Sequence, residues 1–125
     1  MTPNVPLLRK VMEHIEAHPE QHVQRSWRCG TGMCFAGWAA DFSGLEWVYD
    51  PDHLDAELVY TDDDAVLTAA LWEVDEVNGR TAVPVVYAAQ RVLGLTARQA
   101  RWLFASTHSR ANLREIVTSL AGGEL

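Results

Sequence analysis

Two cysteines and three histidines are the side chains of this sequence most capable of chemistry. Cys29 and Cys34 lie within residues 27–38, a stretch that also holds two of the five tryptophans. The chain could bring them to the roughly 5.5 Å Cα separation of a disulfide, or use them as a nucleophile or redox pair. Closing so short a loop would add at most about 2 kcal/mol of stability. We therefore rank core packing first, a disulfide second and thiol chemistry third.

The histidines raise the question of a metal site. His14, His18 and His22 recur every four residues, which would place them on one face of an unbroken helix. Together with Cys29 and Cys34 they could bind zinc. The proline after His18 interrupts the helix, however, and this spacing matches no standard zinc site. We expect no metal and no other cofactor, with His14 partly exposed and His18 hydrogen-bonded at the helix end.

A third pattern concerns nucleic acid. Residues 96–120 predict two helices joined by a short turn, as in proteins that place their second helix in the DNA major groove. The side chains available for such contacts are Arg98, Arg101, Arg110, Asn112 and Arg114. The whole chain is acidic, with a pI of about 5.1, whereas nucleic-acid-binding domains usually carry a basic balance. Nucleic-acid binding is therefore an alternative, and pairing of this basic third with the acidic middle of the chain is the structural interpretation.

Charge is distributed unevenly within the formal net charge of -7. Residues 1–79 hold fifteen acidic and four basic side chains, whereas residues 80–125 hold two acidic and six basic ones. Residues 41–76 contain twelve carboxylates and no lysine or arginine. Such a run is strongly hydrated and self-repelling. It favours a solvated surface that keeps the protein soluble, and it also allows an acidic face for a basic partner.

Two helices must position the cysteines and histidines. The first is predicted over residues 6–17, where apolar side chains recur at helical spacing. The second is predicted between Thr31, a plausible N-cap, and Gly44, which suits a left-handed C-terminal position. The apolar strip of this second helix is formed by Cys34, Trp38 and Phe42. Its width predicts a central helix buried over most of its circumference.

The middle of the chain carries the β pattern. A short strand is predicted over residues 57–61, followed by a helix-prone segment over residues 65–71. Residues 72–77 then alternate apolar and acidic side chains, Asn78-Gly79 is the preferred pair for a type I′ turn, and residues 80–83 form the returning strand. This segment predicts one β-hairpin.

The last third predicts three helices. Pro84 suits a helix start, and Gly94 suits the end of the same helix. Thr96 and Gln99 form a capping box for the next helix, and Ser109 is the expected N-cap of the last. Together with the preceding segments, these patterns predict a mostly α-helical α+β fold of about five helices around a buried central helix, with one β-hairpin.

Length and composition set the class of protein. A chain of 125 residues with 48% hydrophobic content predicts a single globular domain over residues 1–125. No apolar run approaches the roughly 20 residues of a membrane span. The first residues lack the basic and apolar segments of a secretory signal, and two cysteines are too few for a secreted disulfide scaffold. We therefore expect a cytoplasmic protein without a membrane partner.

Short motifs in the first forty and last forty residues form a fairly specific combination. They are His14-Ile15-Glu16-Ala17-His18-Pro19-Glu20, Gln24, Trp27, Cys29-Gly30-Thr31, Cys34, Ala36-Gly37-Trp38-Ala39, Leu93-Gly94-Leu95-Thr96 and Leu103-Phe104. This combination resembles a family of small uncharacterised proteins encoded by actinobacteria and their phages. The acidic middle has no counterpart in that family. The resemblance implies a cytosolic setting and a phage accessory gene, and it supplies no catalytic residue.

These observations favour a non-enzymatic interaction protein, in which a phage-encoded chain binds and modulates a host protein or associates with itself. Trp27 and Trp38 are interpreted as core, whereas Trp47, Trp72 and Trp102 could mark a partner surface. One alternative is a small DNA-binding regulator that uses the last two helices. The other is a metal- or thiol-dependent enzyme whose site is built from His14, His18, Cys29 and Cys34.

Overall fold

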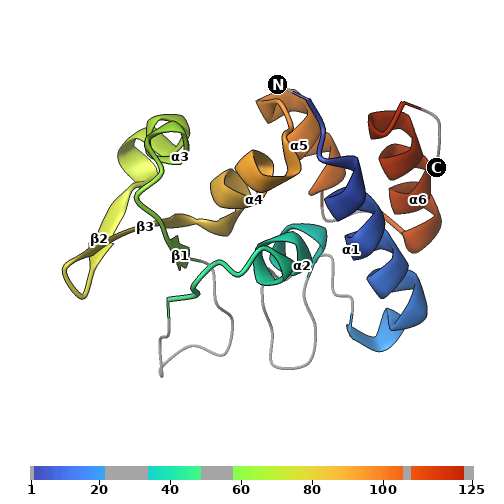
Figure 1. Cartoon of the computed structure of the whole chain (residues 1–125), viewed down its shortest axis with the longest axis horizontal. Coiled ribbons are helices and arrows are strands. Elements are labelled where there is room, and N and C mark those ends of the chain that lie inside the picture. Colours follow the sequence, from blue (N-terminus) through green and yellow to red (C-terminus); the bar gives the residue numbers. More distant parts are fainter. Residues whose placement is uncertain (1, 22–33, 49–57, 106–107, 123–125) are drawn as a thin grey trace.

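Six α-helices and a three-stranded antiparallel sheet form the regular structure of the residues described by the computed structural model, which are 2–21, 34–48, 58–105 and 108–122 (Figure 1). The helices are α1 (Val5–Ala17), α2 (Phe35–Phe42), α3 (Asp64–Ala70), α4 (Val85–Leu93), α5 (Ala97–Leu103) and α6 (Arg110–Leu120). Short 3-10 turns, η1 (Pro19–Gln21) and η2 (Leu71–Glu73), follow α1 and α3. The strands are β1 (Leu58–Tyr60), β2 (Asp75–Val77) and β3 (Arg80–Pro84). The predicted mostly helical α+β class is confirmed.

Helix α1 forms where the apolar spacing predicts it. The Asn4 side chain accepts a hydrogen bond from the Leu7 backbone N–H at 3.2 Å, which satisfies a free donor of the first turn. Pro6 lies in that turn, where it removes no helical hydrogen bond. The buried stripe is Leu8, Val11, Met12 and Ile15. This stripe faces the interior, and His14 lies at its margin, half-buried.

Helix α2 differs from its prediction at its start. Cys34 is extended and acts as the N-cap, so the helix begins at Phe35 rather than just after Thr31, which lies outside the described residues. The Cys34 sulfur accepts from the Gly37 backbone N–H at 3.4 Å. The buried residues of α2 are Phe35, Ala36, Gly37, Ala39 and Ala40. Trp38 is only half-buried, which corrects its interpretation as core, and of the predicted strip only Cys34 is fully buried.

The sheet has the strand order β1-β3-β2, with both pairs antiparallel. Asn78 and Gly79 have φ values of 54° and 73°, as the predicted hairpin turn requires. The first strand of the hairpin is shorter than predicted, because it begins at Asp75. Trp72 belongs to η2 instead, since the backbone turns sharply at Leu71.

The helices of the last third form as predicted. Helix α4 follows Pro84 and ends at Gly94, whose φ of 67° is left-handed. Thr96 and Gln99 make both hydrogen bonds of the capping box at α5. The Ser109 hydroxyl accepts from a backbone N–H in the first turn of α6.

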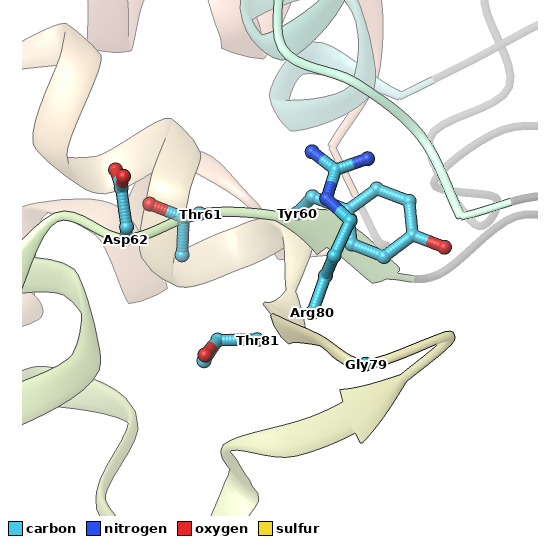
Figure 2. Close-up of a pocket in the computed structure, with 6 residues that line it drawn as sticks. All are labelled: Tyr60, Thr61, Asp62, Gly79, Arg80 and Thr81. Carbon is cyan, nitrogen blue, oxygen red and sulfur yellow. The ribbon is translucent and has the colours of Figure 1, made fainter.

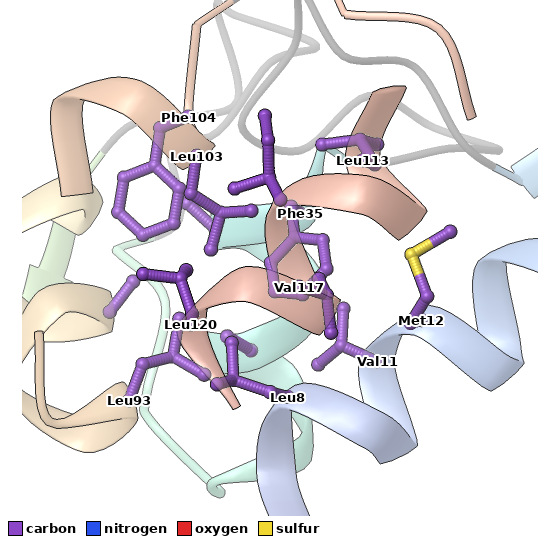
Figure 3. Close-up of a cluster of buried hydrophobic side chains, with 14 of the residues drawn as sticks. Leu8, Val11, Met12, Phe35, Leu93, Leu103, Phe104, Leu113, Val117 and Leu120 are labelled. Atoms are coloured by element: carbon purple, nitrogen blue, oxygen red, sulfur yellow. The ribbon is translucent and has the colours of Figure 1, made fainter. Parts of the chain in front are cut away.

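Two hydrophobic clusters hold these elements together. The larger lies between α1, α2, α4, α5 and α6 and includes Phe35, Leu8, Leu103 and Val117 (Figure 3). The smaller joins the sheet to α3 and α4 and includes Val59, Val66 and Val83. Because α2 and α4 contribute to both, they connect the two ends of the structure. Along the long axis, α3 and the sheet lie at one end, whereas α1 and α6 lie at the other (Figure 1).

Candidate interaction surface

Three large apolar side chains are exposed among the described residues, and two of them are consecutive. Leu71 is 63% exposed and Trp72 is 88% exposed, both in η2, whereas Trp102 on α5 is 45% exposed. Tryptophan buries more apolar area than other side chains and is enriched at the centres of protein interfaces. We call Leu71 and Trp72 the tip.

The backbone holds the tip in an unfavourable conformation. Leu71 has φ 51° and ψ -121°, a combination that suits glycine and that costs an L-residue about 1–2 kcal/mol. This turn ends α3 and directs the chain into η2. Immediately after the tip, Glu73 accepts a hydrogen bond from the Tyr87 hydroxyl on α4, which raises the pKa of Tyr87. The tip is therefore attached to the sheet end of the structure on both sides.

Acidic residues lie on both sides of the tip in the sequence. The exposed acidic residues of this region are Asp62, Asp64, Glu73, Asp75 and Glu76. Asp63 caps α3 and lies 3.5 Å from the Arg91 guanidinium, so its charge is partly neutralised. No lysine or arginine occurs between residues 41 and 76. The segment that carries the two exposed apolar side chains is consequently acidic.

A polar depression of about 390 Å³ lies beside the hairpin (Figure 2). Its lining residues are Tyr60, Thr61, Asp62, Gly79, Arg80 and Thr81. The Arg80 guanidinium stacks 3.9 Å from the Tyr60 ring centroid and forms a 2.5 Å ion pair with Glu46. The Asn78 amide donates to the Tyr60 hydroxyl at 3.1 Å. The arginine and the tyrosine of this depression are therefore already paired within the fold.

The three tryptophans predicted to mark a partner surface differ in their exposure. Trp72 and Trp102 are exposed, but at separate elements. Trp47 differs from the expectation: it is half-buried, packs against the smaller cluster and bridges to Val59 beside β1. Trp27 lies outside the described residues. Leu71 was missed by sequence reasoning, because no local pattern marks a leucine with positive φ.

The histidine and cysteine candidates separate into different environments. His14 packs against aromatic rings, with centroids 4.2 Å from Trp38, 5.1 Å from Phe42 and 4.8 Å from His18. His18 is exposed, 3.6 Å from Glu20. Among the residues with described positions, no group of three histidine, cysteine or acidic side chains could hold a metal ion. His22 and Cys29 lie outside those residues, so a metal site or disulfide that includes them stays untested.

Cys34 belongs to the core. Its side chain is fully buried in the larger cluster. Burial raises the pKa of the thiol to about 11, because the thiolate would lose its hydration, and the hydrogen bond from Gly37 only partly opposes this effect. A thiol in this state is protonated near neutral pH and a poor nucleophile. Packing, the interpretation ranked first, is the arrangement found for Cys34.

The arginine candidates are all exposed, but one of them is committed to the fold. Arg114 on α6 forms a 2.9 Å ion pair with Glu16 on α1. The predicted pairing was with the acidic middle of the chain, whereas this acidic partner lies in α1. The other four candidates are Arg98, Arg101, Arg110 and Asn112. The exposed Glu115 beside Arg114 also makes the second helix a poor match for phosphate groups.

No helix in the described part of the chain is long and apolar enough to cross a membrane.

Comparison with protein families, with curated proteins and with solved structures finds no match to this chain.

Proposed function

We propose that this chain is a non-enzymatic interaction protein that binds a protein partner through the tip. The observation that carries the proposal is the conformation of Leu71 beside Trp72. The strained backbone at Leu71 lies where two large apolar side chains remain exposed, and such strain is concentrated at functional sites.

The chemistry of the tip defines its partner. Burial of a tryptophan and a leucine removes roughly 200–300 Å² of apolar surface from water, which at about 25 cal/mol per Å² stabilises a complex by roughly 5–7 kcal/mol before association costs. The surrounding carboxylates favour a basic rim around the apolar pocket that receives Trp72. We therefore expect a partner with a basic surface. That this partner is a host protein, and that the chain is phage-encoded, stay predictions of the sequence resemblance.

Replacement of Trp72 by serine is expected to abolish capture of the partner while leaving folding unchanged. Trp72 is 88% exposed, so its removal costs almost no packing. The measurement is cross-linking capture from a host lysate, with proteins identified for each variant. Arg110→Ser is the control, because it removes an exposed side chain from another element. Equal capture of the same proteins by the wild type and by Trp72→Ser would contradict the proposal.

Replacement of Leu71 by glycine is expected to raise the free energy of unfolding by about 1 kcal/mol and to weaken partner capture. Glycine adopts φ 51° without steric cost, and this gain exceeds its extra entropy in the unfolded chain. Urea denaturation measures the stability. Leu71→Ser is the control, since it removes the same side chain but keeps the unfavourable backbone. Unchanged stability in the glycine variant would show that the backbone at this position is not strained.

A further inference from the structure

A second exposed apolar residue lies in a basic setting. Arg98, Arg101 and Trp102 are spaced by three and four residues on α5, so they share one side of that helix, and all three are exposed. We call these three residues the α5 face. His108 approaches the Trp102 carbonyl oxygen at 2.6 Å and holds the end of the helix. The α5 face therefore combines an aromatic ring with two guanidinium groups on an ordered element.

The α5 face carries uncompensated positive charge. No acidic residue occurs between residues 77 and 114, a segment with six arginines. Three of these are used in ion pairs within the fold, namely Arg80 with Glu46, Arg91 with Asp63 and Arg114 with Glu16. Arg98 and Arg101 form no ion pair with any residue whose position is described. An acidic ligand is consequently favoured at the α5 face.

The tip and its acidic neighbours in the sequence form an acidic and aromatic segment on the same chain. It lies at the sheet end of the structure, whereas α5 lies beyond α4, so the tip and the α5 face are separate surfaces (Figure 1). The three exposed large apolar side chains of the described residues thus fall on two surfaces of opposite charge. Each surface offers what the other requires, which is an aromatic contact surrounded by charges of the opposite sign.

We infer that the tip of one copy binds the α5 face of a second copy. This inference rests on the proposed function and names a second copy of this chain as the partner. In such a contact Trp72 packs against Trp102, and the carboxylates near the tip pair with Arg98 and Arg101. The contact is head-to-tail, so each complex retains a free tip and a free α5 face, and association continues with concentration. So small a contact predicts weak, reversible self-association.

Sedimentation velocity over a range of protein concentrations tests this inference. At low ionic strength the average mass of the wild type is expected to rise with concentration, and about 0.5 M salt is expected to return it to the monomer value. Trp72→Ser and the double variant Arg98→Glu/Arg101→Glu are each expected to remain monomeric. Arg110→Glu, at an exposed arginine outside the α5 face, is expected to behave like the wild type.

Mixing the two defective variants gives the sharpest result. Trp72→Ser retains only its α5 face, and Arg98→Glu/Arg101→Glu retains only its tip. An equimolar mixture is therefore expected to form a dimer and nothing larger. A mixture that stays monomeric, or association of either variant alone, would overturn the inference.

Two further outcomes separate this inference from its alternatives. If the wild type is monomeric throughout while Trp72-dependent capture of another protein persists, the second copy is the wrong partner and the proposed function stands. If the wild type is monomeric and binds duplex DNA through Arg98 and Arg101, the α5 face is a nucleic-acid surface and the inference is overturned.

Discussion

Replacement of Phe35 by alanine is expected to lower the free energy of unfolding by about 3–5 kcal/mol. Phe35 is the first residue of α2 and is fully buried in the larger cluster (Figure 3). Removal of the ring leaves a cavity between closely packed helices. The cavity cannot close unless these helices shift relative to one another. Domains of this size are stable by about 5–15 kcal/mol, so the loss is a large fraction of the total. Urea denaturation followed by circular dichroism measures it.

Phe42→Ala is the matched control for this prediction. Phe42 lies at the other end of α2, where it is half-buried and contacts His14 and Trp38 at the surface. Because solvent can fill the space it leaves, we expect a loss no more than half that of Phe35→Ala. Equal losses for the two variants would mean that α2 is not inserted into the core through its first turn.

Local signals were sufficient to predict much of the fold. The apolar stripe of α1, the capping box at Thr96 and the Ser109 cap all depend on residues within one or two helical turns. The turn at Asn78-Gly79 depends on two residues alone. In each case the hydrogen bond or the dihedral angle that fixes the element involves neighbours in sequence, so the pattern carries the information.

Signals failed where packing of distant segments decides the conformation. The alternation over residues 72–77 predicted a strand from Trp72, yet the chain forms η2 there because Leu71 turns the backbone and Glu73 bonds to α4. A second failure concerns a local contact: α2 begins three residues later than a Thr31 cap would imply, because Cys34 takes the capping position and accepts from the Gly37 N–H. Neither event has a local marker, since cysteine and leucine rarely occupy such positions.

The candidate surfaces could be predicted only in outline. The separation of acidic and basic residues is visible in the sequence, and the structure places the two groups on different elements. Which tryptophans reach the surface was not visible, because an aromatic side chain of the same type is packed at Trp47 and exposed at Trp72. The sequence also does not show that Arg114 forms an ion pair within the fold. Its partner is Glu16, ninety-eight positions away, and the pair compensates the charge that Arg114 would offer to a ligand.

Gly94 shows how the N-terminal segment is joined to the end of α4. Its φ is 67°, and a Cβ at this position would overlap the Thr2 carbonyl oxygen and lie 3.3 Å from the Asn4 nitrogen. The same contact region holds two hydrogen bonds, from the Asn4 backbone N–H to Leu93 at 2.7 Å and from the Asn4 side chain to Val92 at 3.0 Å. The N-terminal segment therefore packs against the end of α4 at a site where only a residue without a side chain fits.

Replacement of Gly94 by alanine is expected to lower the free energy of unfolding by about 3 kcal/mol. Roughly 1–2 kcal/mol comes from a left-handed backbone at alanine, and the remainder comes from displacing backbone atoms of residues 2–4. Gly44→Ala is the control, since its φ is 73° and a Cβ there meets nothing within 4 Å, so only the backbone cost remains. Denaturation of both variants separates the two effects. A loss at Gly94 no larger than that at Gly44 would mean that the N-terminal segment does not dock on α4.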